Sequence, residues 1–309
     1  MTCCCPGLKP HTLRETDETH DTMARPLSQN ERAWQQLYDD LHSKGFQLRP
    51  RYSAQCPPGH KDYPIPYNDG SMNDASHATY GRVVLKFANS AEREMLEQLR
   101  SIPDANQHVL PLLSSLHAGP EGNLIVMPFF GKLGTAPYFE TSKDLMCALL
   151  QVAQGVAFMH SHNIAHGAIH RDNFVEDRSQ LIPGGFHFVA TGWSSDLKNR
   201  IQVVKGGRSA TQPKIFIVNL RSAKEVSPGA VELSNDIEGL LHTIASLLED
   251  YSELLPSLTA RMTATEVVEV LKAEFDKEPR MLVHRVRPWF TYFHQQLTIN
   301  HTRQIDQFH

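Results

Sequence analysis

The sequence predicts an α+β chain with two unlike lobes. A strand-rich portion comes first, one connecting strand follows, and a helix-rich portion completes the order. No internal repeat interrupts this order. The chain has 309 residues, of which 40% are hydrophobic, so it can bury a full core as one large domain or as two smaller lobes.

The first part of the chain is predicted to hold a tail, a helix and a loop. Residues 1–30 are polar and carry three prolines, which predicts a disordered tail. The stretch NERAWQQLYDDLHSKGF then places Trp34 and Leu41 at helical spacing, with Gly45 as a C-cap. Residues 53–80 are rich in Pro, Gly, Asn, Asp and Ser, which predicts a long loop with one short strand.

Four segments predict the rest of the strand-rich portion. GRVVLKFA (81–88) is typical of a strand, and SAEREMLEQLRSI (90–102) is typical of a short helix. HVLPLLSSLHA (108–118) and NLIVMPFF (123–130) predict two more strands. An N-terminal helix followed by a β-rich lobe is therefore expected over residues 31–130.

From residue 141 the pattern becomes helical. TSKDLMCALLQVAQGVAFMHSH begins with a Thr-x-x-Asp cap and carries an apolar stripe. KIFIVNL (214–220) predicts a strand, and SNDIEGLLHTIASLLEDYSELL predicts a second long helix. MTATEVVEVLKAEF predicts another helix, with a capping box formed by Thr263 and Glu266. We expect a helical lobe over residues 131–309.

Composition excludes several classes of function. The net charge is −4, so no broad cationic field favours nucleic-acid binding. No apolar run approaches the roughly 18–20 residues that a membrane helix needs, so no transmembrane segment is expected. The N-terminus lacks the apolar region of a secretory signal, which predicts a cytoplasmic or otherwise intracellular location. The adjacent Cys3–Cys5 cluster is not part of a disulfide framework, and its role stays open between acylation, metal binding and a plain tail.

The stretch MHSHNIAHGAIHRDNF (159–174) raises the question of function, because it concentrates four histidines in one short segment. It resembles the segment that protein kinases carry after a long helix, of the type "HrDiKpeN". His166, Ile169 and Asn173 fall in register with that pattern. The sequence is thus similar here to a catalytic loop.

Further motifs follow in the order of the protein-kinase-like superfamily. Lys86 in VVLKF corresponds to the nucleotide-binding lysine of the third strand, and NLIVMPFF resembles the strand that leads into the hinge. IVNLRSA takes the place of the Asp-Phe-Gly segment, while Asp236 and Arg261 match two C-lobe positions. The resemblance covers about 80–300 and implies a bilobal protein-kinase-like fold with a small β-rich N-lobe and a larger helical C-lobe. The LRPRY stretch and the long polar insertions resemble a divergent fungal group of kinase-like proteins.

Several groups that phosphoryl transfer requires are replaced at the matching positions. The resemblance puts Ala168 at the catalytic aspartate and His170 at the following lysine. Asn219 replaces the metal-binding aspartate, and Arg221 places a cation where Mg²⁺ should lie. The stretch from Asn219 to Asp236 is short and lacks Ala-Pro-Glu, and no Gly-rich loop precedes the strand lysine.

The resemblance therefore implies a pseudokinase that acts as a scaffold or regulator by binding protein partners. Lys86, Asn173 and Asn219 are the candidate nucleotide contacts, and they imply weak binding of ATP or none, without Mg²⁺ dependence. Glu92 or Glu94 is the candidate for the helix glutamate, although Glu92 follows the lysine so closely that little room is expected. The partner and the oligomeric state are not predicted.

An active enzyme is the alternative hypothesis. An atypical phosphotransferase with a protein or small-molecule substrate would use Asp172 as a displaced acid. In a shifted register, His170-Arg171-Asp172 forms the literal catalytic triplet, but the metal-binding asparagine then becomes Asp177. The loop also resembles that of aminoglycoside and choline-type phosphotransferases, where Ala168 again replaces the aspartate.

Three other features each have a functional and a structural interpretation. His166 and His170 have the spacing of zinc ligands on a helix, but we favour a structural role in an irregular loop. The aromatic stretch HRVRPWFTYFHQQL (284–297) is either a partner-binding helix or a cover for the base of the C-lobe. The helix around Trp34 either caps the N-lobe or docks to a partner.

Overall fold

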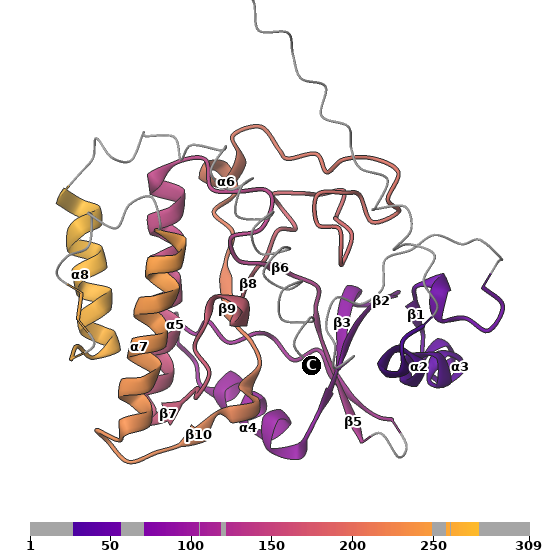
Figure 1. Ribbon diagram of the computed structural model, residues 1–309, viewed down its shortest axis with the longest axis horizontal. Coiled ribbons are helices and arrows are strands. Elements are labelled where there is room, and N and C mark those ends of the chain that lie inside the picture. Colours follow the sequence, from indigo (N-terminus) through magenta and orange to yellow (C-terminus); the bar gives the residue numbers. More distant parts are fainter. Residues whose placement is uncertain are drawn as a thin grey trace, which may run out of the picture.

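The computed structural model describes residues 27–56, 71–104, 106–118, 122–248, 258–259 and 261–277. The predicted tail up to residue 26 with its Cys3–Cys5 cluster, the loop at 57–70 and the aromatic stretch at 284–297 lie outside these residues. Figure 1 shows a sheet at one end of the molecule and a group of helices at the other. The predicted α+β chain with two unlike lobes is confirmed.

The sheet end is a five-stranded antiparallel sheet with the strand order β1-β2-β3-β5-β4. Its strands are β1 (Phe46–Leu48), β2 (Met72–His77), β3 (Gly81–Ala88), β4 (Ser114–His117) and β5 (Asn123–Pro128). The predicted strand at 108–118 is shorter than expected. Pro111 lacks a backbone N–H, and Val109 instead forms a parallel bridge with Ile217 of the other lobe.

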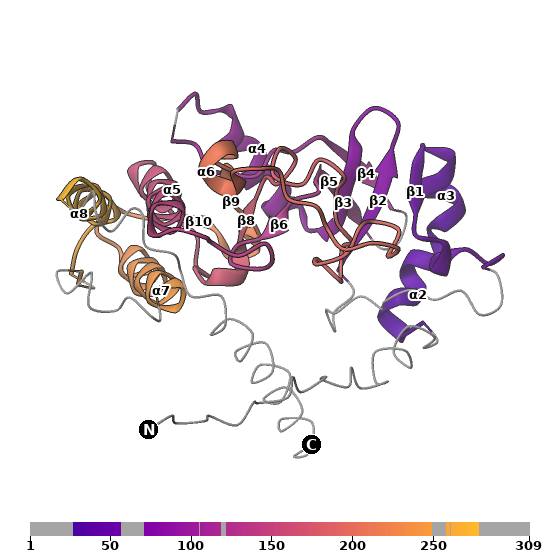
Figure 2. The same cartoon turned by 90° about the horizontal axis from the view of Figure 1, so that it is seen from above.

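One face of this sheet is covered by the N-terminal helices. Val83 and Leu85 alternate along β3 and are fully buried in a cluster with Trp34. The predicted single helix is two helices, α2 (Gln29–Gln36) and α3 (Tyr38–Ser43), which meet at Leu37. Gly45 adopts a positive φ of 87° after them, the conformation of a helix C-cap. Figure 2 shows both helices on the outer side of the sheet, so the helix around Trp34 caps the N-lobe.

The helical lobe is built around α5 (Ser142–Ser161). Thr141 and Asp144 form the predicted reciprocal capping box at its start. Its apolar stripe packs against α7 (Val231–Leu247) and α8 (Ala264–Lys277), which lie beside it in Figure 1. Thr263 and Glu266 form the capping box of α8 as predicted. Among the described residues, no helix combines the length and the apolarity that a membrane crossing requires.

The remaining elements are shorter and are distributed over both lobes. They are α4 (Ser90–Ser101), β6 (Gly131–Lys132), β7 (Ile164–Ala165), η3 (Arg171–Asn173), β8 (Phe174–Glu176), α6 (Gly207–Thr211), β9 (Ile215–Ile217), η4 (Leu220–Ser222) and β10 (Lys224–Glu225), after η1 (Pro50–Tyr52) in the N-lobe. β6, β8 and β9 form a three-stranded sheet, and β7 pairs with β10. The predicted strand at 214–220 is confirmed over residues 215–217 only, since η4 begins at Leu220. Although β8 and β9 are adjacent in the sheet, residues 177–214 separate them in the sequence.

Candidate functional site

A cavity of about 360 Å³ lies where the two lobes meet. Val84 of β3 and Met127 of β5 line it from the N-lobe, and Val175 of β8 lines it from the C-lobe. The predicted site residues that line the cavity are Lys86, Asp172, Asn173 and Asn219. Ala168 is not among the lining residues. The structure thus brings four of the five predicted positions together around one space.

Lys86 forms a buried ion pair with Glu92. The distance from Lys86 Nζ to Glu92 Oε1 is 2.5 Å, and the two side chains are 8% and 3% exposed. The expectation of too little room for Glu92 was wrong. Asn89 caps α4 by accepting a hydrogen bond from the Glu92 backbone N–H at 2.8 Å, so the helix starts directly after β3. The first turn therefore carries Glu92 back over the strand, while Glu94 is 65% exposed beside Arg93.

Two asparagines continue the network from Lys86 into the C-lobe. Lys86 Nζ donates to Asn219 Oδ1 at 2.9 Å, and Asn219 Nδ2 donates to Asn173 Oδ1 at 3.3 Å. Asn173 Nδ2 donates in turn to the backbone oxygen of Ala168 at 2.7 Å. Asn219 adopts a positive φ of 66°, a conformation that asparagine tolerates better than most residues. The network carries one cation and one anion, and these already neutralise each other.

The loop that contains Ala168 is anchored from below by Asp236 of α7. Asp236 is 1% exposed, as expected for the buried acid of the resemblance. Its Oδ2 accepts from the His166 backbone N–H at 2.6 Å, and its Oδ1 accepts from the Gly167 N–H at 2.9 Å. His160 Nε2 lies 3.1 Å from Asp236 Oδ2. One carboxylate therefore fixes the backbone on the N-terminal side of Ala168.

The position of Ala168 is determined by its neighbours and not by its own side chain. Gly167 has a positive φ of 73°, and a Cβ there would lie 2.9 Å from the backbone oxygen of Ser222. The Ala168 N–H donates to Nδ1 of His166 at 3.2 Å, and Nε2 of that ring lies 3.0 Å from the Val218 oxygen. Burial lowers the pKa of His166, which favours the neutral ring that these two hydrogen bonds need.

The remaining polar side chains of the loop face different ways. Asp172 is 70% exposed and lies 3.6 Å from Lys132 Nζ. His170 Nε2 accepts from the Asn173 side chain at 2.9 Å. Arg221, which the sequence places at the metal position, is exposed and does not line the cavity. Arg221 belongs to the short η4 turn, whose buried residue is Leu220, so the prediction of a cation inside the cleft was wrong.

The four clustered histidines have separate partners. Their contacts are His160 with Asp236, His162 with the Phe158 oxygen, His166 with the Val218 oxygen and His170 with Asn173. Within the described part of the chain, no group of three or more His, Cys, Asp or Glu side chains is placed to hold a metal ion. The structure therefore gives no support to the zinc interpretation.

Residues 177–214 contribute to the cavity, and the sequence reasoning missed them. Phe188 from this segment lines the cavity, and Phe186 packs on Phe129 with ring centroids 4.8 Å apart. The available signal was the long connection between the segment at 159–174 and the predicted strand at 214–220, which contains the stretch GGFHFVATGW and exceeds an ordinary loop. Aromatic residues in such a connection indicate a packed segment.

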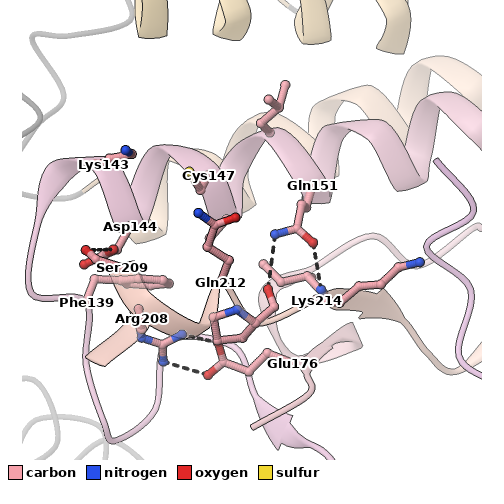
Figure 3. A pocket seen from close by; sticks show the side chains of 14 residues that line it. Phe139, Lys143, Asp144, Cys147, Gln151, Glu176, Arg208, Ser209, Gln212 and Lys214 are labelled. Atoms are coloured by element: carbon pink, nitrogen blue, oxygen red, sulfur yellow. Dashed lines mark hydrogen bonds and ion pairs between the residues drawn. The ribbon is translucent and has the colours of Figure 1, made fainter. Parts of the chain in front are cut away.

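A second cavity, of about 480 Å³, lies on the C-lobe between α5, α6 and β9 (Figure 3). Glu176 at its floor is 1% exposed and contacts two buried arginines, Arg178 and Arg208. Figure 3 shows the Arg208 and Glu176 side chains directed toward each other. Gln151 of α5 accepts from the backbone N–H of Ile215 at 3.0 Å, which ties this helix to β9.

Comparison with known proteins gives similarity of fold only. No protein-family model matches the chain, and no curated protein matches it. The chain is similar to a solved structure of the Rad53 kinase domain and SCD2 in complex with AMPPNP, at 15% identity over 76% of this chain and 78% of that chain, with a TM-score of 0.40. The autoinhibited serine kinase domain of titin shows 16% identity over 70% and 79% of the two chains, with a TM-score of 0.39. The BubR1 kinase domain shows 12% identity over 68% and 78%, with a TM-score of 0.45.

Identities and TM-scores this low say nothing about activity. The fold is instead identified from the arrangement of the elements. A small antiparallel sheet carries a buried lysine–glutamate pair, a larger lobe is helical, and a cavity lies where they meet. The chain therefore has the bilobal protein-kinase-like fold that its sequence resemblance implies.

Proposed function

We propose that this chain is a pseudokinase, in which an N-lobe (31–130) and a C-lobe (131–309) form a binding platform for protein partners. The observation that carries the proposal is the anchored loop around Ala168. Asp236 fixes the backbone of that loop. However, the position of the catalytic base is occupied by Ala168, whose side chain is only a methyl group. A fixed backbone without a reactive side chain suits a structural role.

The polar network in the cleft also favours binding over phosphoryl transfer. A metal-dependent kinase needs a carboxylate to hold Mg²⁺ beside the phosphates. Here the matching side chain is the neutral Asn219, and its Oδ1 already accepts a hydrogen bond from the Lys86 ammonium. A dication would have to displace that ammonium without gaining a carboxylate ligand at position 219. We expect Lys86, Asn173 and Asn219 to allow weak, metal-independent contact with ATP at most.

An atypical phosphotransferase that uses Asp172 is the second candidate. The observation in its favour is that Asp172 lines the cavity, next to Asn173 in the chain. However, its side chain is 70% exposed, and Lys132 Nζ lies 3.6 Å away. A general base works best when its environment positions it toward the substrate. We therefore rank this candidate below the pseudokinase.

Thermal unfolding with ATP tests the state of the cleft. We expect little or no rise in the unfolding midpoint with millimolar ATP, and the same result with and without Mg²⁺. A ligand at 100 times its Kd would add about 2.7 kcal/mol, an effect that raises the midpoint by several degrees. A rise that requires Mg²⁺ would contradict the proposal, because it would mean that the cleft holds a metal–nucleotide complex.

A phosphotransfer assay separates the two candidates. With generic protein and small-molecule acceptors and radiolabelled ATP, we expect the natural chain to transfer no phosphate above background. The double variant Ala168→Asp, Asn219→Asp restores both missing carboxylates and serves as the gain-of-function comparison. Transfer by the natural chain that disappears in Asp172→Asn, with an unchanged unfolding midpoint, would establish the active enzyme instead.

A further inference from the structure

Residues 177–214, here named the strap, leave the C-lobe at β8 and return to it at β9. The two strands pair in antiparallel register, with Glu176 opposite Ile215, so a short turn would be enough to join them. Figures 1 and 2 show that the chain instead extends from α6 toward the N-lobe sheet. The middle of the strap thus lies against the N-lobe, while Arg178 and Arg208 near its ends stay bound to Glu176 of the C-lobe.

The strap contacts the N-lobe mainly at Phe129, the residue that follows β5. The Phe129 ring lies 4.8 Å from the ring of Phe186 and 5.8 Å from the ring of Phe188. The Arg82 guanidinium of β3 covers Phe129 at 3.9 Å from its centroid and also donates a hydrogen bond to the Phe186 oxygen. These contacts join the strap to two adjacent strands of the sheet.

The strap has a packed interior of its own. Leu181, Ile182 and Phe186 are at most 4% exposed and form a separate apolar cluster against Phe129. The buried His187 accepts hydrogen bonds from two following backbone N–H groups at Nδ1, at 3.2 and 3.1 Å. The backbone N–H of His187 donates to the backbone oxygen of Trp193 at 2.8 Å. Phe188 therefore follows a backbone segment that these hydrogen bonds and the apolar cluster hold in place.

Phe188 lines the cavity between the lobes. It shares this lining with Val84 and Met127 of the sheet and with Phe130 at the junction of the lobes. The apolar surface of Val84, Met127 and Phe130 suits a flat ring, and Phe188 takes up part of the space that such a ring would fill. Because the strap supplies one of these rings, a movement of the strap changes the space that a ligand meets.

We infer that the strap is an intramolecular gate of the cavity, and that Phe188 controls the entry of flat aromatic ligands. This inference rests on the proposed function, because it concerns regulation of the same cleft. In this inference, the contacts of Arg82 and Phe129 with the strap keep Phe188 against the cavity. A gate that is open one-tenth of the time lowers the apparent affinity of a ligand about tenfold.

The test compares Phe188→Ala with the natural full-length chain. Two probes are titrated: adenosine, a flat ring without phosphates, and 1-anilinonaphthalene-8-sulfonate, a dye for any open apolar cavity. Phe139→Ala is the matched control, because Phe139 is a half-buried ring that lines the other cavity. We expect both probes to bind about tenfold more tightly to Phe188→Ala, and their affinity for Phe139→Ala to be unchanged.

Failure of the gate and failure of the proposed function appear in different measurements. If only the dye gains affinity for Phe188→Ala, the gate holds and the cavity does not accept a nucleoside ring, whereas the proposed function fails only in the ATP and phosphotransfer measurements above. If neither probe gains affinity, or if Phe139→Ala gives the same gain, the gate is rejected. Should Phe188→Ala not fold, Arg82→Gln removes the cover of Phe129 without removing a ring. The same gain is expected there, and its absence rejects the gate.

Discussion

Replacement of Glu176 by glutamine is expected to lower the free energy of unfolding by about 3–5 kcal/mol. Glu176 lies 2.5 Å from Arg178 Nη2 and also contacts both terminal nitrogens of Arg208. The three side chains are at most 5% exposed. Glutamine has nearly the same shape but no charge, so two guanidinium groups would be left buried without a counter-ion.

Urea unfolding at neutral pH measures this loss, with Glu140→Gln as the control. Glu140 is exposed and lies near the same cavity, so its neutralisation should change the free energy of unfolding by less than about 0.5 kcal/mol. A loss below about 1 kcal/mol in Glu176→Gln would mean that the arginines find other partners, such as the backbone oxygens they already contact. The Arg178 side chain is 0% exposed, and this burial lowers the pKa of its guanidinium.

Asp236→Asn is expected to lower the free energy of unfolding by about 3 kcal/mol and to loosen the loop around Ala168. Both carboxylate oxygens of Asp236 accept backbone N–H groups, from His166 and Gly167. An asparagine places an NH₂ group against one of these donors, and a buried donor without an acceptor costs about 1–3 kcal/mol. The His160 contact at 3.1 Å is weakened as well.

Hydrogen exchange combined with urea unfolding checks this result. The amides of His166 and Gly167 should exchange much faster in Asp236→Asn than in the natural chain. Glu238→Gln is the control, since Glu238 is exposed on the same helix. If the loss of stability appears without faster exchange at these two amides, Asp236 stabilises the lobe but does not anchor the loop.

Elements with local signals could be predicted from the sequence. The β3 strand begins and ends as expected, because alternating apolar residues and flanking turn residues specify it. The long helix α5 begins at its predicted cap, since Thr141 and Asp144 satisfy each other's backbone N–H groups. The helix around Trp34 was less predictable. It divides at Leu37, which is partly buried against the N-lobe core, and no periodicity in the sequence marks that position.

The candidate site was predictable in its residues and less so in its geometry. Lys86, Asn173 and Asn219 line one cavity, as the order of their motifs implies. The pairing of Lys86 with Glu92 depends on how tightly α4 follows β3, and spacing alone argued against it. The outward position of Arg221 depends on a single turn of backbone. Such features arise from tertiary geometry and leave no periodic trace in the sequence.

The long connection between β8 and β9 also affects how the chain folds. An ordinary hairpin closes from its turn within microseconds, but these strands can meet only after the whole of 177–214 has been looped out. Each doubling of such a loop adds about 0.6 kcal/mol of entropic cost. The pairing of Phe174 with Ile217, which positions Asn173, is therefore a non-local step. The contacts that form the floor of the cleft join residues far apart in the sequence. We therefore expect this part of the molecule to form slowly during folding.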